Sequence, residues 1–120
     1  MDNQFPAWNI NNNEFTLDLQ DLNDVEKYTK ACDVLSEQEK SFDKNAARQV
    51  QIKAYCKMYY DFFDTLFGEG TSQKIFEGRM NARICDIVFA DFIKYIEATH
   101  SYNAKISGDT AALLSKYISR

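Results

Sequence analysis

Apolar and polar residues alternate near the start of the chain. In residues 8–10 and 15–19 every other position is apolar, and three asparagines at 11–13 lie between the two segments. A period of two gives a strand one buried face, and asparagine tolerates the left-handed backbone angles of a tight turn. The pattern predicts a β-hairpin over residues 8–19. This hairpin must pack on other elements or on a partner, because two strands alone are barely stable.

From Asp21 the apolar spacing changes to three and four residues, which is typical of one helix face. Asp21 or Asn23 can cap this first helix, because a side-chain oxygen there accepts from a free backbone N–H. The polar stretch at 36–46 predicts that the helix ends before about Lys44, although one helix over residues 22–67 also fits the pattern. The apolar stripe consists of Val25, Tyr28, Cys32 and Leu35.

Residues 50–67 carry the broadest apolar face of the chain. Apolar residues at steps of four form one row, and a second row lies directly beside it. A face this wide suits the central helix of a bundle. The alternative is a groove or a self-association surface. The first row is Val50, Ala54, Met58, Phe62 and Leu66, and the second is Tyr55, Tyr59, Phe63 and Phe67.

Glycines separate the elements of the second half. Gly68 can stop the central helix in a left-handed conformation, and Gly78 ends a short helical turn that follows. The apolar spacing then predicts a long helix from about residue 81 to residue 99. Residues 101–108 are polar and predict a linker. Residues 109–118 predict a short C-terminal helix, and Asp109 can cap it.

These elements predict a mainly α fold in a single domain of residues 1–120. It is a helical bundle of three long or medium helices plus short helices, with an N-terminal β-hairpin, and its helical core covers residues 22–99. A chain of 120 residues buries roughly two-thirds of the surface that its unfolded form exposes, so it needs no metal or disulfide to fold.

Charge and hydropathy narrow the function classes. The chain has 18 acidic and 14 basic residues, which give a net charge of −4, whereas a phosphate-binding surface has to be positive. No apolar run reaches the roughly 18 residues that span a bilayer. The N-terminus lacks the basic and apolar regions of a signal peptide. We therefore expect a cytoplasmic protein with neither nucleic acid nor membrane as its partner.

Cysteine and histidine positions bear on enzymatic function. Cys32, Cys56 and Cys85 are far apart in the sequence, and His100 is the only histidine. This spacing fits neither a zinc site nor a redox dithiol, and nothing indicates a Cys–His nucleophile. We expect buried cysteines in a reducing compartment, no metal, no cofactor and no enzymatic activity.

The segment 61–72 combines three carboxylates with two glycines. Asp61 and Asp64 are three residues apart, so they miss the alternate spacing of a calcium loop. The order of the glycines, Ser72 and Lys74 also differs from a P-loop. We expect Asp61, Asp64 and Glu69 on a solvated helix surface and its adjoining turn.

Three groups of residues are candidates for contact with a protein partner. The aromatic residues of 55–67 lie among both lysines and aspartates, which favours packing over base stacking. Arg79 and Arg83 form a small basic cluster, which is either a partner contact or a solvated helix start. The C-terminal helix docks either on its own bundle or in the groove of a neighbour. The candidates are Tyr55, Tyr59, Phe62, Phe63, Leu66, Phe67, Arg79, Arg83, Leu113 and Tyr117.

One segment has a distinctive order of residues, FFDTLFGEGTSQKIFEG at 62–78. With Ile52, Asn81, Arg83 and Cys85 around it, it resembles small tail-assembly-chaperone-like proteins encoded in tail gene clusters of Gram-positive siphophages and prophages. Residues 10–28 resemble the hairpin and first helix of that family. Lys116-Tyr117 lies where the family often carries a similar Lys-Tyr pair.

The resemblance implies a non-catalytic protein that binds the phage tape measure protein in the bacterial host cytoplasm, where several copies would coat it. It also implies a possible homo-oligomer. The contacts would come from residues 50–67, the turn at 68–78 and the C-terminal helix. The residues implied to maintain the turn, rather than to touch the tape measure protein, are Phe63, Phe67, Gly68, Gly70, Thr71 and Phe76.

The residues alone leave a second possibility open, a phage anti-defence inhibitor that occupies the nucleic-acid channel of a host nuclease, or another small acidic protein-binding module. Such a mimic needs carboxylates clustered on one face. Four carboxylates gather at 18–26, but Lys27 and Lys30 follow closely. The positive charges of these lysines argue against a surface patch of purely negative charge.

Overall fold

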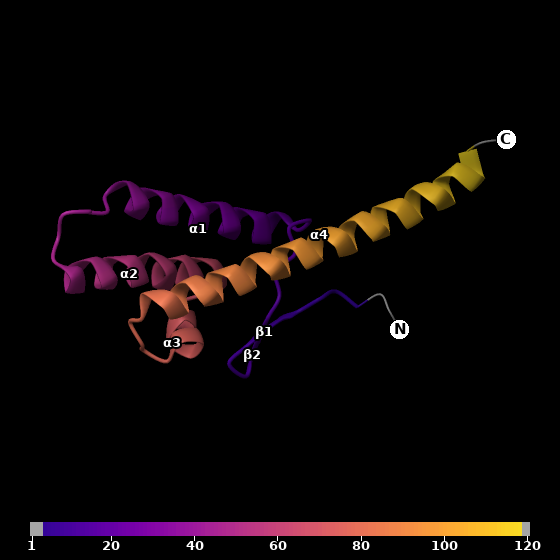
Figure 1. Ribbon diagram of the computed structural model, residues 1–120. Helices are drawn as coiled ribbons and strands as arrows, with labels where there is room; N and C mark the ends of the chain where they lie inside the picture. Colours follow the sequence, from indigo (N-terminus) through magenta and orange to yellow (C-terminus); the bar gives the residue numbers. More distant parts are fainter. Residues whose placement is uncertain (1–3, 119–120) are drawn as a thin grey trace.

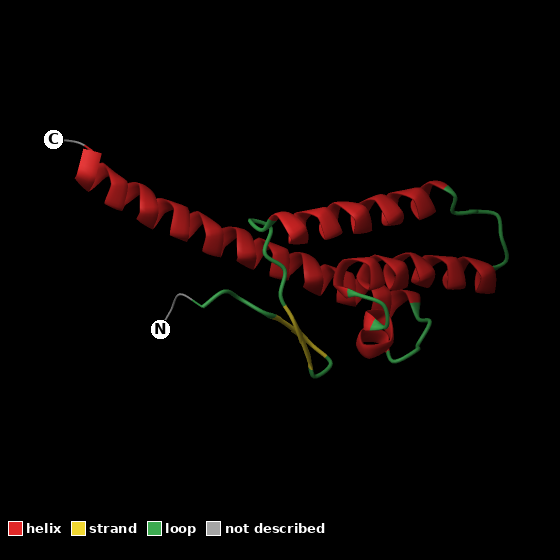
Figure 2. Cartoon of the chain, turned by 180° about the vertical axis from the view of Figure 1, so that it is seen from behind, coloured by secondary structure: helices red, strands yellow, loops and turns green. Residues whose placement is uncertain are grey.

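The computed structural model describes residues 4–118, with side chains as far as Lys116. It is mainly helical, at 71%, with four helices and an N-terminal hairpin in this range, which confirms the predicted fold class. The helices α1 and α2 lie side by side, and α4 packs on α2 before it leaves the body (Figures 1 and 2). The elements are β1 (Trp8–Ile10), β2 (Asn13–Phe15), α1 (Leu22–Lys40), α2 (Arg48–Phe67), α3 (Thr71–Phe76) and α4 (Ala82–Ile118).

The hairpin turns through Asn11 and Asn12, whose φ angles are 48° and 63°. Two positive φ values in a two-residue loop match the twist of the flanking strands, and asparagine adopts them at low cost. Trp8 pairs with Phe15, and β2 ends there. The hairpin therefore ends at Phe15 and not at residue 19, where the sequence predicted its end. The reason is that the N–H of Leu17 bonds to the Tyr95 hydroxyl, at 2.9 Å, instead of extending a ladder.

The segment 22–67 forms two helices. The Asp21 carboxylate accepts from the N–H of Asp24 at 3.3 Å and caps α1, so Asp21 rather than Asn23 is the cap of the two that the sequence offered. At the other end, the N–H of Ser41 bonds to the carbonyl of Glu37 at 3.3 Å. A loop over 41–47 then turns the chain, so that α2 runs back along α1 (Figure 1).

A tight turn joins α2 to α3. Gly68 ends α2 with φ 114° and ψ 154°, which is an extended conformation open to glycine rather than the predicted left-handed one. Gly70 has φ 93° and ψ −10° and is the residue in the left-handed region. A β-carbon is unfavourable at both positions because of the positive φ.

Helix α4 is continuous from Ala82 to Ile118, so the predicted linker at 101–108 and the separate helix at 109–118 are wrong. A single glycine inside a helix costs only about 1 kcal/mol relative to alanine, and no proline interrupts the segment. Asp109 is not a cap, because it lies in the interior of α4, where its carboxylate pairs with Lys105 at 3.2 Å.

The distal part of α4 projects from the body (Figures 1 and 2). The radius of gyration is 18.2 Å and the principal extents are 69 × 30 × 21 Å. A compact chain of this length would have a radius of gyration of about 14 Å. We call residues 100–118 the α4 extension; every described side chain from 104 to 116 is exposed.

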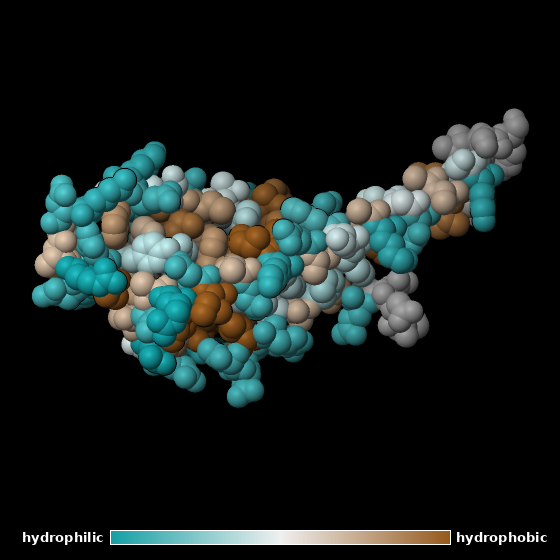
Figure 3. Space-filling model, viewed as in Figure 1, coloured by the Kyte–Doolittle hydropathy of each residue, from teal (hydrophilic) through white to brown (hydrophobic). Residues whose placement is uncertain are grey.

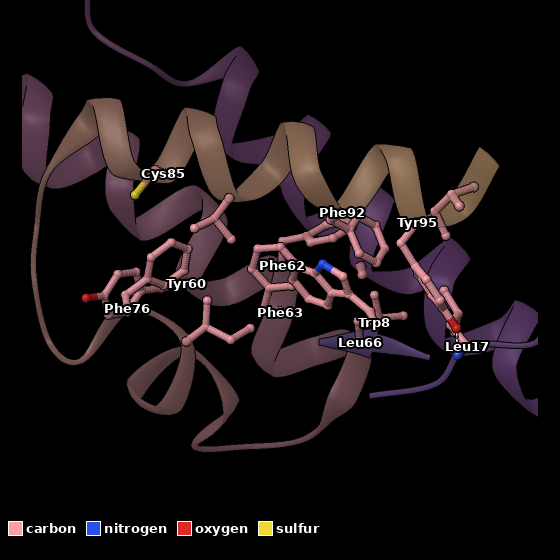
Figure 4. Close-up of a cluster of buried hydrophobic side chains, with 14 of the residues drawn as sticks. Trp8, Leu17, Tyr60, Phe62, Phe63, Leu66, Phe76, Cys85, Phe92 and Tyr95 are labelled. Carbon is pink, nitrogen blue, oxygen red and sulfur yellow. Dashed lines mark hydrogen bonds between the residues drawn. The ribbon is translucent and has the colours of Figure 1, made fainter. Parts of the chain in front are cut away.

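The core gathers around Trp8 (Figure 4). Its indole is 3% exposed and stacks on Phe63 at a centroid distance of 5.4 Å, while Phe92 meets it edge-on at 5.2 Å. The indole N–H donates to Asp91 on α4 at 2.8 Å. Trp8 thereby joins β1 to both long helices of the core.

Further hydrogen bonds fasten the hairpin and its flanks to the helices. The Tyr95 hydroxyl donates to the carbonyl of Pro6 at 3.0 Å and accepts from Leu17 (Figure 4). The side chain of Asn13 donates to the carbonyl of Lys74 at 3.2 Å, and that of Asn11 donates to the carbonyl of Ile75. The hairpin therefore packs on its own helices.

Replacing Trp8 tests this arrangement. We expect Trp8→Ala to lower the free energy of unfolding by about 3–5 kcal/mol, because it removes a buried aromatic ring and leaves a cavity. Urea unfolding followed by circular dichroism measures the change. Asn9→Ala, at an exposed position of the same strand, should stay within about 0.5 kcal/mol of the parent. Equal losses in the two variants would contradict a central role for the indole.

Candidate protein-binding surface

The broad apolar face of α2 is mostly interior. Phe62, Phe63 and Leu66 are at most 2% exposed, so their prediction as partner contacts is wrong for this folded chain. Periodicity shows that a face is apolar but does not show what covers it. Here α1, α4 and the hairpin together cover this face, and Phe62 and Phe63 both contact Phe92 of α4.

The other predicted aromatic residues of α2 are half-buried. The Tyr59 hydroxyl donates to the Tyr55 hydroxyl at 3.3 Å, which in turn donates to Asp86 of α4 at 2.5 Å. The hydrogen bond to Asp86 is the main reason that the pKa of Tyr55 is raised. Phe67 stacks on Phe15 at 4.8 Å. These side chains connect elements of the body and leave only their edges for a partner.

Asp64 is a structural residue of the α2–α3 turn. Its two carboxylate oxygens accept from the backbone N–H of Ser72 at 2.7 Å and from the Ser72 hydroxyl at 3.0 Å. The carboxylate thus satisfies a free N–H in the first turn of α3, which is the function of a helix cap. The expectation of a freely solvated carboxylate is wrong for Asp64. Glu69, in the same turn, is exposed as expected.

Asp61 links α2 to α1. Its carboxylate accepts from the side chain of Gln38 at 2.7 Å and pairs with Lys57 at 2.5 Å. The aspartate is half-buried, so it too departs from the expected solvated surface. Both aspartates of the segment act in the fold.

The acidic cluster at 18–26 surrounds the start of α1. Asp24 accepts from the N–H of Asp18 at 2.8 Å, and Asp18 accepts from the N–H of Gln20 at 2.9 Å. With the Asp21 cap, three of these carboxylates order the turn that leads into the helix. Their negative charge remains beside the base of the α4 extension.

The cysteines lie within the body. Cys56 and Cys85 are fully buried and Cys32 is half-buried, and all three are free thiols. Burial raises the pKa of each thiol, to about 12 for Cys85. Raised pKa values disfavour the thiolate, which is the reactive form.

The basic cluster lies at the start of α4. Arg79 and Arg83 are exposed, and the carbonyl of Arg79 accepts from the Tyr60 hydroxyl at 2.7 Å. Asn81 caps the helix by accepting from the N–H of Ile84 at 3.0 Å. A hydrogen bond to α2 therefore holds the backbone at Arg79, and Arg83 lies in the first turn of α4.

An apolar hollow lies between α4 and the hairpin. Ile87 is 60% exposed although it is large and apolar, and Ile10 of β1 lies beside it in a depression of about 420 Å³. Figure 3 shows an apolar area over α4 next to the hairpin. We call this the hairpin hollow; its lining is Ile10, Ile87, Val88, Ala90, Asp91 and Lys94. Sequence reasoning missed it because strand and helix are far apart in the chain, although the outward position of Ile87 was a signal.

The α4 extension is the second apolar surface. Leu113 is 56% exposed and Leu114 is 52% exposed, whereas Ile106 lies nearer the body. Of the two residues predicted here as contacts, Leu113 is available, and the side chain of Tyr117 lies outside the described part. The alternative that this segment docks on its own bundle does not hold, because the described side chains project away from it.

The described residues contain neither a cluster suited to a metal ion nor a helix suited to cross a membrane. Within residues 4–118, histidine, cysteine and carboxylate side chains form no group of three or more suited to a metal ion. None of the helices in this range is both long and apolar enough to cross a membrane.

Asp64 can be tested by truncation. We expect Asp64→Ala to lower the free energy of unfolding by about 1–2 kcal/mol, because it leaves the N–H of Ser72 uncapped. Faster amide exchange in 71–76 should accompany the loss. Glu69→Ala is the matched control and should change stability by less than about 0.5 kcal/mol. An unchanged exchange rate in α3 would refute the capping assignment.

The buried thiols predict both slow labelling and alkaline sensitivity. At pH 8 a thiol reagent should leave Cys56 and Cys85 unmodified until urea unfolds the chain. The folded-state pKa of Cys85, about 12, exceeds its reference value of 9.0. Stability from this group is therefore present below about pH 9 and is lost as the pH rises toward 12.

The thiol prediction has a matched variant. Cys85→Ala should show a smaller fall in the urea midpoint between pH 9 and pH 11 than the parent. Rapid labelling of Cys85 in the native protein would contradict its burial.

Comparison with known proteins gives one assignment. A family model described as "Family of unknown function (DUF6673)" matches residues 11–120. No curated protein and no solved structure gives a significant match. The match covers β2 and all four described helices and begins just after β1. The chain therefore belongs to the family of unknown function DUF6673.

Proposed function

We propose that this protein is a non-catalytic tail assembly chaperone, which holds a helical segment of a phage tape measure protein in the cytoplasm of the bacterial host. The resemblance of residues 52–85 suggests the partner. The observation that carries the proposal is the hairpin hollow, where Ile87 stands exposed beside Ile10 on a rigid support.

The hollow suits an amphipathic helix. Helix-in-groove recognition uses apolar side chains of one helix face as anchors in a complementary groove. Ile10 and Ile87 provide two aliphatic walls, and Ala90 leaves room between them. A partner helix could place one or two leucine-sized side chains in a depression of this volume.

The support of the hollow is preorganised. Trp8 donates to Asp91, and both residues belong to elements that line the hollow. Binding to a preformed surface loses less conformational entropy than binding to a mobile one. The position of β1 is therefore part of the binding surface.

Exposed cations on α4 indicate which charges would lie beside the apolar stripe of a partner helix. Arg83 lies one turn before Ile87, and Lys94 lies about two turns after it, so the three share one helix face. Both cations are exposed. A partner helix with acidic residues beside its apolar stripe complements this face.

A binding experiment tests the proposal. The tape measure protein of the same phage or prophage is divided into overlapping segments, and their dissociation constants are measured by calorimetry. Ile87→Asp should weaken binding by at least about tenfold, because a buried apolar contact is replaced by a charge. Val50→Asp is the control, since Val50 is similarly exposed, at 55%, on another surface.

The outcomes separate the surface from the partner. Equal binding of the parent and Ile87→Asp would exclude the hairpin hollow. Absence of binding to every segment, with the parent folded by circular dichroism, would exclude the tape measure protein. Capture of a host nuclease in its place would favour an anti-defence inhibitor.

A further inference from the structure

The α4 extension is a helix that its own sequence supports poorly. Most of the stability of a helix in a protein comes from the packing of one face, so a segment without tertiary contacts relies on its own helix propensity. Several of its residues are weaker helix formers than alanine, and the described body does not cover it. A second element that packs on it would supply the missing stabilisation. The weak helix formers are Ser101, Asn103, Ser107, Gly108, Thr110 and Ser115.

The face of α4 that packs on the core continues into the α4 extension as a regular pattern of positions, which we call the seam. Phe92, Ile96 and Thr99 face the core of this body and are buried. The same alternation of four and three residues continues outward through five further positions. A repeat of 3.5 residues is the signature of a coiled-coil seam. The outer positions are Asn103, Ile106, Thr110, Leu113 and Tyr117.

We propose that the α4 extension pairs with the α4 extension of a second copy of this chain, in antiparallel orientation about a two-fold axis. In this register Leu113 packs against Thr110 of the partner subunit. Ile106 lies level with position 117 of the other copy. Because the axis is two-fold, each contact occurs twice.

Charge complementarity selects the second copy and the orientation. In an antiparallel pair the residues that flank the seam on one side face each other, so Asp109 lies near Lys116 of the partner subunit, about 3 Å away along the axis. In a parallel pair Asp109 would face the position of Leu114. In this register Asp109, which already pairs with Lys105 of its own helix at 3.2 Å, gains a second cation from the other copy.

The end of the chain is basic whereas the rest of it is acidic. Residues 100–120 contain three basic residues and one acidic residue, whereas residues 1–99 contain eleven basic and seventeen acidic residues. Asp18 lines a groove of about 460 Å³ at the base of the extension, together with Tyr102 and Ser107. Lys116 of the partner subunit comes level with Ser107, at the rim of the groove that contains Asp18.

Asn103 lies where the seam leaves the body. Its side-chain Nδ2 is inaccessible to solvent and has no hydrogen-bond partner within the described chain. An asparagine at a seam position of a coiled coil sets register and orientation at some cost in stability. Asn103 also lines the groove that contains Asp18, so the residue lies at the edge of the proposed interface.

Sedimentation equilibrium of the full chain tests the pairing. The parent should be a dimer at about 100 µM, and Leu113→Asp should raise the dimer dissociation constant by at least about a hundredfold, because two buried leucines are lost. Ser115→Asp adds the same charge on the opposite face of the extension and should remain dimeric. A monomeric parent at this concentration would overturn the proposal, as would equal dimerisation of both variants.

A charge exchange tests the orientation without removing apolar surface. Asp109→Lys should weaken the dimer by about threefold to tenfold at low salt, because like charges then face each other. Adding Lys116→Asp to that variant should restore the parent dissociation constant within about twofold. Failure of the restoration would refute the antiparallel register. Ile87→Asp should leave the dimer intact, so this result is independent of tape measure binding.

Discussion

The burial of Trp8 between α2 and α4 is the contact on which the rest of the structure depends. A two-stranded hairpin of six paired residues cannot hold its own shape in water. The indole supplies both a large apolar surface and one polar group, and Asp91 satisfies that group at 2.8 Å. With Trp8 buried, Phe15 stacks on Phe67, and the side chain of Asn11 in the hairpin turn donates to the carbonyl of Ile75 in α3.

The position of the hairpin in turn creates the hairpin hollow. Ile87 alone would be one exposed apolar residue, which is common on protein surfaces. Ile10 converts it into a recessed apolar site because β1 lies against α4. The α4 extension is a different kind of surface, because it is a helix that the described body leaves uncovered. The two surfaces therefore allow one partner on the body and a second copy at the extension.

The polar groups that stand out in the sequence act mainly in the fold. Asp64 caps α3, the Tyr95 hydroxyl bridges Pro6 and Leu17, and Tyr55 ties α2 to Asp86. Side chains of the segment 62–78 also act in the fold. The Thr71 hydroxyl donates to the carbonyl of Gly68 at 2.7 Å, and Phe76 stacks on Tyr60 at 4.9 Å. Residues of this segment thus build a turn that presents Arg79 and Arg83.

The sequence by itself determined the local elements. Periods of two and of 3.6 predicted the hairpin and the helices of residues 22–99, the asparagines predicted the turn, and Asp21 was one of two predicted caps, because these features depend on neighbouring residues. Tertiary structure decided which apolar residues are covered. Phe62 and Leu66 are interior whereas Ile87 and Leu113 are exposed, since burial depends on elements far away in the chain. It also showed that α4 runs through Gly108, where weak local preferences are close to balance and packing of the first half holds the helix start.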